Sequence, residues 1–269
     1  MALPWDKVFL SSNTELNSRT ILYASEGQNV NSVSRSIVKR ILGKIDSKDY
    51  SNLPLEEIAS QNFIFLYPKE KSVIDIDQIR DSFKYLFLKS DSKRLLYLEN
   101  IERVETRTFN TLLKFSEEAD KNMIICMATN NINIVPKTIL SRFQKLKIPK
   151  PSNENVKEYL INLGLNFDEQ KNDFVLQNLN LLSEDGDKNI NELFLEFNEY
   201  EAKKEILTKD KEEIKLFLDY QIHKIKFNML KLKSHNKGKL DELRNLRKQL
   251  LMPHNLSLDV LKSKLCLYI

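Results

Sequence analysis

The segment from Pro136 to Phe143 (PKTILSRF) contains one arginine, Arg142, shortly after an apolar run that ends at Thr129 and Asn130. An arginine guanidinium stays ionised in proteins and offers a planar fork of donors that fits phosphate oxygens at two points. Held by a rigid helix at the edge of an α/β domain, Arg142 could stabilise phosphate charge in a neighbouring subunit. The competing interpretation is a surface arginine near the end of a helix.

A second candidate segment, Ser25–Ser32 (SEGQNVNS), lies between an apolar run and a helical pattern, where a phosphate-binding loop would be expected. Such a loop needs glycines whose backbone N–H groups cradle phosphates, then a lysine and a Ser or Thr. Here Val30 stands at the last glycine and Asn31 at the lysine, while Glu26 adds negative charge. A β-branched side chain obstructs close backbone approach, and an amide cannot replace the ammonium. We therefore expect a degenerate loop that holds no nucleotide or other cofactor, formed by Gly27, Val30, Asn31 and Ser32.

Short apolar runs in the first half of the chain predict the strands that position these segments. The runs are Ile21–Tyr23, Phe63–Tyr67, Leu95–Leu98 and Met123–Ala128. Runs of this kind are typical of strands that are covered on both faces. Helical patterns lie between them, so the alternation predicts an α/β domain with a parallel sheet over residues 1–150.

The second half of the chain has a helical pattern throughout. Pro149 and Pro151 interrupt the sequence, and no strand pattern returns after them. We predict a small helical lid over residues 151–205 and a further helical domain over residues 206–269. Amphipathic helices need a partner surface to bury their apolar stripes. The stripes of the last domain include Ile214, Phe217, Leu218, Leu261 and Leu265.

Several segments resemble bacterial clamp-loader AAA+ subunits. FNTLLKFSEE (109–118), MATNN (127–131) and SRF (141–143) are similar to the LLKxLEEP, sensor 1 and Ser-Arg-Cys elements. NFIFLYPKEKSVIDIDQIR (62–80) is similar to a passage of the DNA polymerase III delta prime and gamma/tau subunits. NLSLDVLKSKLCLYI (255–269) resembles the terminal helix of delta prime. The resemblance is best over residues 62–149.

The resemblance implies an AAA+-like parallel-sheet domain followed by an all-α lid and an all-α collar. In LLYLENIE (95–102), Glu99 takes the position of the metal-binding Asp and Asn100 that of the water-activating Glu of the Walker B motif. An amide cannot act as a general base. Asn130 takes the sensor 1 position, and Asn189 replaces the usual sensor 2 arginine. These departures imply a subunit without ATPase activity of its own.

What the resemblance implies about partners follows the delta prime pattern. Ser141 and Arg142 would contact a neighbouring subunit, where Arg142 would act in trans as an arginine finger. The collar helices would join gamma/tau and delta subunits, and the complex would load the sliding clamp on primed DNA. We assign the paired Glu117 and Glu118 no catalytic role. Residues 43–61 lack Cys and His, so the zinc module of many relatives is absent and we expect no metal.

Composition limits the classes of protein that fit the chain. Its 269 residues suit two or three domains, and five glycines with 30% charged residues are typical of a mostly helical soluble protein. Two cysteines, Cys126 and Cys266, lack metal or disulfide spacing, which favours core thiols in a reducing cytoplasm. We see no signal peptide at the N-terminus and no apolar run long enough to span a bilayer.

Two other classes of function stay open. An active AAA+ ATPase, such as a motor subunit or an initiator, is disfavoured by Val30, Asn31 and Asn100. A helical nucleic-acid-binding scaffold is supported by residues 221–250, which contain nine Lys or Arg against two Asp or Glu. An ordinary solvated helix face has the same composition. Nucleotide binding and co-purification with polymerase subunits would separate these hypotheses.

Overall fold

The computed structural model describes residues 3–12, 16–25, 27–68, 73–86, 92–165, 167–182, 190–232, 236–251 and 257–268. Its internal contacts divide the chain into two compact units. The sheet unit comprises Met1–Asn155 and Gln177–Glu184, and the helical unit comprises Val156–Leu176 and Asp185–Ile269. Most of the predicted lid and all of the predicted collar belong to the helical unit, so their separation into two domains stays a prediction.

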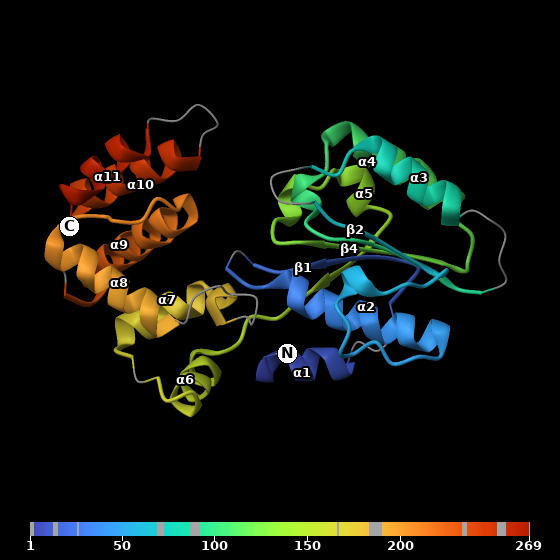
Figure 1. Cartoon of the computed structure of the whole chain (residues 1–269), viewed down its shortest axis with the longest axis horizontal. Coiled ribbons are helices and arrows are strands. Elements are labelled where there is room, and N and C mark those ends of the chain that lie inside the picture. The colour runs from blue at the N-terminus through green and yellow to red at the C-terminus, as the bar shows by residue number, and fades with distance from the viewer. Residues whose placement is uncertain are drawn as a thin grey trace. The chain divides into compact units, whose positions relative to one another are not determined.

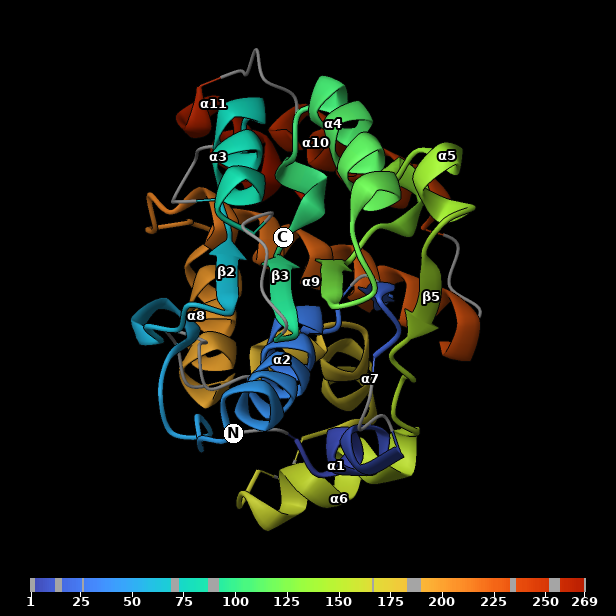
Figure 2. The ribbon, with the colours of Figure 1, turned by 90° about the vertical axis from the view of Figure 1, so that its right-hand side faces the viewer.

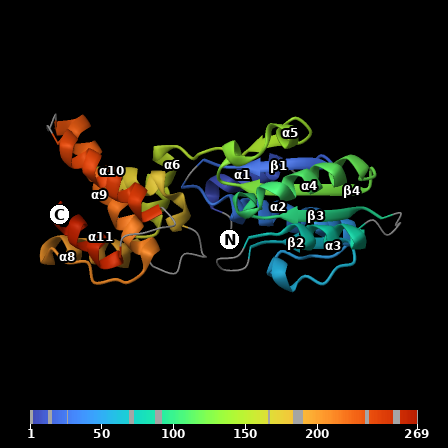
Figure 3. The same ribbon diagram turned by 90° about the horizontal axis from the view of Figure 1, so that it is seen from above.

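Five parallel strands form the sheet, in the order β2-β3-β4-β1-β5. They are β1 (Arg19–Tyr23), β2 (Phe63–Leu66), β3 (Arg94–Leu98), β4 (Met123–Thr129) and β5 (Gln144–Lys147). Figure 3 shows β1, β4, β3 and β2 side by side in this order. The four apolar runs of the sequence coincide with four of these strands, and the predicted α/β parallel sheet is confirmed.

Strand β5 has no counterpart in the sequence prediction. It lies at one edge of the sheet that the described residues form, where it pairs with β1. Its sequence is QKLK, in which Lys145 and Lys147 are exposed and Leu146 is partly buried. An edge strand has one side in contact with water, and lysines there discourage pairing with a second chain. Such a strand needs no apolar run.

Helices cover both faces of the sheet (Figures 1 and 2). One face carries α1 (Pro4–Ser12) and α2 (Val30–Asp46), and the other carries α3 (Ile76–Leu86), α4 (Thr106–Glu118) and α5 (Lys137–Leu140). Successive strand residues point to opposite faces. Leu22 therefore packs in the core beneath α2, and its neighbour Ile21 packs in the core beneath α3 and α4.

The helical unit is built around aromatic side chains. Its helices are α6 (Asn153–Asn162, starting in the sheet unit), α7 (Glu169–Gln177), α8 (Ile190–Lys203), α9 (Lys211–Leu232), α10 (Lys237–Leu251) and α11 (Leu258–Cys266). Phe197 of α8 lies 5.1 Å from Phe217 and 5.3 Å from Tyr220 of α9, measured between ring centroids. Phe174 of α7 meets Tyr220 edge to face at 5.2 Å. Rings in these arrangements hold α7, α8 and α9 together.

The apolar stripes predicted to contact partner subunits are internal. The five side chains concerned are at most 4% exposed and comprise Ile214, Phe217, Leu218, Leu261 and Leu265. The expectation that these stripes need a surface from another subunit is therefore wrong. The reason is that α8, α10 and α11 pack around α9 within the same chain (Figure 1).

The remaining sequence expectations concern cysteines and membranes. Cys126 is buried in β4 and Cys266 is partly buried in α11, and both are free thiols. Burial raises the pKa of the Cys126 thiol. None of the helices in the described ranges combines the length and apolarity that crossing a membrane requires.

Candidate functional site

The predicted phosphate loop joins the carboxyl end of β1 to the start of α2. Asn29 is the N-cap of α2, and its side-chain oxygen accepts a hydrogen bond from the backbone N–H of Ser32 at 3.0 Å. Asparagine is a favoured N-cap because it satisfies a free N–H of the first turn. Val30 is the first residue of the helix and is fully buried in the core between α2 and the sheet. The residue at the last glycine position is therefore a core side chain.

Several polar groups of the loop are hydrogen-bonded within the chain. The backbone N–H of Ser25 donates to Gln28 Oε1 at 3.0 Å, and the N–H of Gln28 donates to the carbonyl of Ser25 at 3.1 Å. Gln28 Nε2 donates to the carbonyl of Pro149 at 3.0 Å. A phosphate loop works because its N–H groups point at the ligand. Here the N–H groups of Ser25, Gln28 and Ser32 are already bonded within the protein.

Gly27 is covered by the segment around η4 (Leu179–Leu182), which belongs to the same unit. Its φ is 85°, and a Cβ atom there would lie 1.8 Å from the carbonyl oxygen of Gln177. The carbonyl of Gly27 also accepts a hydrogen bond from the N–H of Asn180 at 2.8 Å. The glycine thus serves the packing of η4 on the loop. Glu26, whose charge we expected to repel phosphate, lies outside the described residues, as does Asn189.

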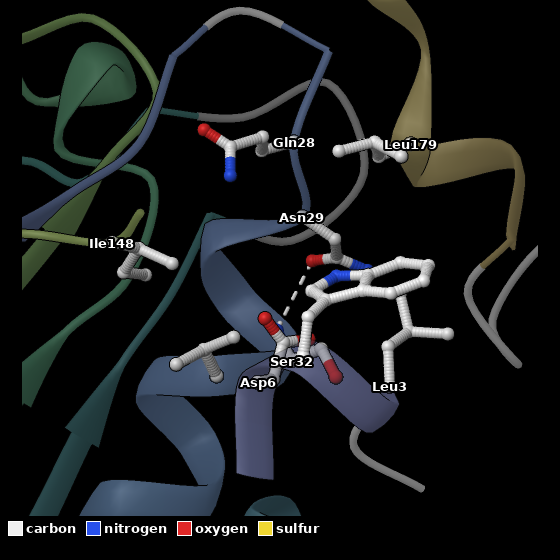
Figure 4. A pocket seen from close by; sticks show the side chains of 9 residues that line it. Leu3, Asp6, Gln28, Asn29, Ser32, Ile148 and Leu179 are labelled. Atoms are coloured by element: carbon white, nitrogen blue, oxygen red, sulfur yellow. Dashed lines mark hydrogen bonds between the residues drawn. The ribbon is translucent and has the colours of Figure 1, made fainter. Parts of the chain in front are cut away.

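A small cavity of about 20 Å³ lies beside this loop (Figure 4). It is lined by Leu3, Trp5, Asp6, Gln28, Asn29, Ser32, Val33, Ile148 and Leu179. A volume of this size holds about one water molecule and excludes a nucleotide base. Burial raises the pKa of the Asp6 carboxyl to about 6, against a backbone hydrogen bond with Leu3 that lowers it.

The carboxylate at the metal-binding position is held by an arginine of the same chain. Glu99 follows β3 and is 3% exposed. Arg35 of α2 donates from Nε to Glu99 Oε2 at 2.6 Å and from Nη2 to Glu99 Oε1 at 2.9 Å. Such a two-point pair is the strongest common form of ion pair in proteins. The cation beside the Glu99 carboxylate is therefore the guanidinium of Arg35.

Further contacts fix this ion pair in place. Glu56 in η1 (Leu55–Glu57) lies 3.0 Å from Arg35 Nη2, and the guanidinium lies 5.4 Å from the ring centre of Phe65. Burial alone would lower the pKa of Arg35, but the hydrogen bond and the charge of Glu99 outweigh it and raise that pKa. The Tyr97 hydroxyl donates to Glu99 Oε2 at 3.3 Å. Burial and the charge of Glu99 raise the pKa of Tyr97. The carboxylate thus receives three donors from the chain.

Asn31, at the lysine position, and Asn100, at the general-base position, are joined by a hydrogen bond between their side-chain amides. Asn31 Nδ2 donates to Asn100 Oδ1 at 3.0 Å. Asn100 has a φ of 54°, a left-handed conformation that asparagine tolerates better than most residues. The Oδ1 atoms of Asn31 and Asn130 are both buried without a hydrogen-bond partner among the described residues. Neither member of the pair carries a charge that could bind phosphate or take a proton.

Thr129 and Glu102 add a second contact at this end of the sheet, where Asn130 follows β4. Thr129 Oγ1 donates to Glu102 Oε2 at 2.8 Å and accepts from the N–H of Asn131 at 3.0 Å. Our reading of the sequence missed Glu102, Thr129 and, above all, Arg35. Arg35 lies four residues after Asn31, and residues at this spacing share one helix face. A cation one turn beyond the lysine position was the available signal.

Arg142 lies at the other predicted site, just after α5. Its neighbours Ile139 and Phe143 are buried in the core, and Arg142 itself is exposed. Arg142 Nε lies 2.8 Å from Glu117 Oε1 of α4. Its Nη1 donates to the carbonyl of Thr138 at 3.2 Å and, more weakly, to Ser141 Oγ at 3.4 Å. The backbone of Arg142 is anchored in the core while its guanidinium faces outward.

The five-stranded parallel sheet with helices on both faces defines an AAA+-like α/β fold. A family model described as "DNA polymerase III, delta subunit" matches residues 10–152, more than half of the chain. The chain belongs to this family, which is part of the clamp-loader AAA+ class.

Individual relatives match a shorter segment. The chain is 33% identical over 103 residues to DNA polymerase III subunit gamma of Buchnera aphidicola subsp. Baizongia pistaciae, covering 37% of this chain and 27% of the relative. It is 32% identical over 102 residues to the subunit gamma of Buchnera aphidicola subsp. Schizaphis graminum, covering 36% and 28%. The matched segment thus spans little more than a quarter of these relatives.

Among solved structures, the chain is similar to a DNA polymerase III gamma subunit-related protein from Thermotoga maritima. The TM-score is 0.43 with 16% identity, covering 93% of this chain and 80% of that one.

Proposed function

We propose that this chain is a non-hydrolysing clamp-loader subunit of delta prime type. In this role it helps to load the sliding clamp on primed DNA and acts on ATP that a neighbouring subunit holds. The observation that carries the proposal is the two-point ion pair between Arg35 and Glu99. An ATPase needs this carboxylate to hold a magnesium ion. A guanidinium bound there supplies positive charge but has no open coordination position.

Two further observations support the absence of hydrolysis. The hydrogen bond between the side-chain amides of Asn31 and Asn100 stands where a lysine and a general base would be required. The loop N–H groups of Ser25, Gln28 and Ser32 are bonded internally, and the adjoining cavity has room for only about one water molecule. Nucleotide binding would require several of these contacts to break together.

Arg142 supports a role on a neighbouring subunit. Its guanidinium is exposed, and its described contacts are with α4 and α5. An arginine supplied in trans stabilises the charge that spreads over the transferred phosphoryl group. We propose that Ser141 and Arg142 contact the ATP site of an adjacent gamma/tau subunit.

The helical unit is our candidate for assembly with the gamma/tau and delta subunits in the cytoplasm. The apolar stripe residues that the sequence predicted as partner contacts are internal. The contact surface must therefore come from exposed positions of the same helices. Leu195 of α8 and Leu230 of α9 are 66% and 84% exposed and are available for such contacts.

The test is to reconstitute the complex with wild-type chain, Arg142→Ala, Arg142→Lys or Arg107→Ala, and to measure ATPase with clamp and primed DNA. Arg107 is the matched control, because it is an exposed arginine that also pairs with a glutamate, Glu105. We expect Arg142→Ala to lower ATPase roughly two- to tenfold, because one of several sites loses its finger. Arg142→Lys should rescue poorly, because an ammonium lacks the fork. Wild-type ATPase with Arg142→Ala would refute the role in trans.

The isolated chain is measured in parallel. We expect neither ATP binding nor phosphate release. Turnover that disappears with Asn31→Ala would favour an active ATPase instead. Failure of the wild-type chain to join the polymerase subunits would favour the nucleic-acid scaffold.

A further inference from the structure

Some of the N–H donors of the Arg142 guanidinium have partners among the described contacts, and the others do not. A guanidinium carries five N–H donors, one on Nε and two on each terminal nitrogen. Glu117 engages Nε, while the carbonyl of Thr138 and the hydroxyl of Ser141 engage Nη1. The described contacts leave both donors of Nη2 available to an acceptor outside the chain.

We infer that Glu117 is a positioning residue for Arg142. Its carboxylate fixes the Nε edge of the guanidinium, so that Nη2 is presented to phosphate oxygens of the neighbouring subunit. The inference rests on the proposed function, because it assigns a role to Glu117 only if Arg142 acts in trans.

The contact geometry allows Glu117 to set the orientation of the Arg142 side chain. The Cα atom of Arg142 is already fixed by the buried side chains of Ile139 and Phe143. The long side chain that follows has several free rotations, and a free arginine loses much of this freedom when it binds. Contacts from α4 and α5 restrict that freedom before the neighbour arrives. Correct placement before reaction is a general source of rate enhancement.

The pair between Arg142 and Glu117 contributes little to the stability of the fold. The side chains of Arg142 and Glu117 are 42% and 51% exposed. Ion pairs at such positions contribute little to stability because water screens them. Loss of the Glu117 charge should therefore change the orientation of Arg142 without unfolding the sheet unit.

The chain contains a matched control at the next position. Glu118 ends the same helix, is exposed like Glu117, and lies 3.9 Å from Lys114 instead of an arginine. Glu118→Gln removes the same charge from the same turn of α4. The Glu118→Gln variant therefore measures the general electrostatic effect of losing this charge. The Glu117→Gln variant also measures the loss of the contact with Arg142.

The experiment compares Glu117→Gln, Glu117→Asp, Glu118→Gln, Arg142→Ala and the double variant Glu117→Gln/Arg142→Ala in the reconstituted complex. We expect Glu117→Gln to lower kcat of the DNA-stimulated ATPase about twofold with KM for ATP unchanged, because positioning acts on the transition state. Glu117→Asp should recover part of the loss, and Glu118→Gln should match wild type. The double variant should equal Arg142→Ala.

A second measurement uses the isolated chain. The Nε–H signal of Arg142 in a ¹⁵N NMR spectrum should shift in Glu117→Gln and stay in place in Glu118→Gln. Wild-type ATPase with Arg142→Ala would overturn the proposed function itself. If Arg142→Ala impairs the complex, then an unchanged or increased kcat in Glu117→Gln overturns the positioning role alone. Equal losses in Glu117→Gln and Glu118→Gln, or additive losses in the double variant, overturn it as well.

Discussion

The guanidinium of Arg35 and the carboxylate of Glu99 form a two-point ion pair between α2 and the end of β3, with N to O distances of 2.6 and 2.9 Å. Glu99 is almost fully buried, while Arg35 keeps about a third of its side chain in water. A buried carboxylate is costly unless it is paired and hydrogen-bonded. The pair therefore makes each partner dependent on the other.

Substitution of Arg35 alone should destabilise the sheet unit. We expect Arg35→Leu to lower the free energy of unfolding by about 2–4 kcal/mol, somewhat less than for a fully buried pair, because Glu99 is left without its partner. The double variant Arg35→Leu/Glu99→Leu should recover a large part of that loss. Urea denaturation of the wild-type chain, Arg35→Leu, Glu99→Leu and the double variant measures the coupling energy between the two residues. Arg107→Leu, which breaks an exposed pair, is the control and should change little. Additive effects of the two single substitutions would contradict the dependence.

Gly27 should tolerate no side chain. Gly27→Ala places a methyl group 1.8 Å from the backbone oxygen of Gln177, so we expect a loss of more than about 3 kcal/mol in unfolding free energy. Gly164 has a similar φ of 75°, but a Cβ there meets nothing within 4 Å. Gly164→Ala therefore isolates the cost of the left-handed backbone, roughly 1 kcal/mol. Thermal and urea denaturation measure the loss of unfolding free energy in both variants. Equal losses in Gly27→Ala and Gly164→Ala would show that the segment around η4 does not pack tightly against the loop.

Asp6 should make the sheet unit less stable at neutral pH than at pH 4. Its pKa is raised from 3.8 to about 6, so the folded protein holds the proton more tightly than the unfolded chain. The stability that the protonated carboxyl contributes is complete below pH 3.8 and is lost as the pH rises through about 6. We expect Asp6→Asn to increase the unfolding free energy by about 1–2 kcal/mol at pH 7.5. The same substitution should have little effect at pH 4, which urea denaturation at both pH values can check.

His223 should give the helical unit the opposite dependence on pH. Burial lowers the pKa of its imidazole below 6.5, while the charge of Asp173, 3.4 Å away, works against that effect. The unfolded chain then takes up the proton first, so stability is full above pH 6.5 and falls as the pH drops below it. We expect His223→Gln to flatten the curve of melting temperature between pH 5 and 7.

Asp173→Asn is the companion variant for this prediction. Removal of the carboxylate leaves the imidazole with less support for its protonated form, so the loss of stability below pH 6.5 should become steeper. An unchanged curve in both variants would show that His223 does not control the acid stability of the helical unit.

The sequence predicted the buried part of the sheet well, and the physical reason is clear. Strands β3 and β4 are covered on both faces and are mostly apolar, so a run such as Met123–Ala128 is easy to recognise. β5 lies at the edge, where lysines suit the environment as well as apolar residues do. Its polar sequence therefore gave no strand signal.

The sequence named the residues that stand at the expected motif positions, but it did not predict the contacts that these residues make. Asn31 and Asn100 were expected to be inert, and the structure joins them by a hydrogen bond. Arg35 carries no motif, and only the folded helix brings it to Glu99. The assignment of partner contacts to the apolar stripe of the collar was wrong for a similar reason. A stripe such as Ile214–Leu218 does not say whether it is covered by the same chain or by another.

Under the proposed function, the hydrogen bond between Asn31 and Asn100 and the ion pair between Arg35 and Glu99 would make a return to ATP hydrolysis difficult in evolution. A lysine at position 31 would place a second cation one helical turn from Arg35 and would break the hydrogen bond to Asn100. Removing Arg35 first would leave Glu99 buried and unpaired. Each single step lowers stability before it restores any activity. Selection on a lineage with this arrangement would therefore tend to preserve the proposed absence of hydrolysis.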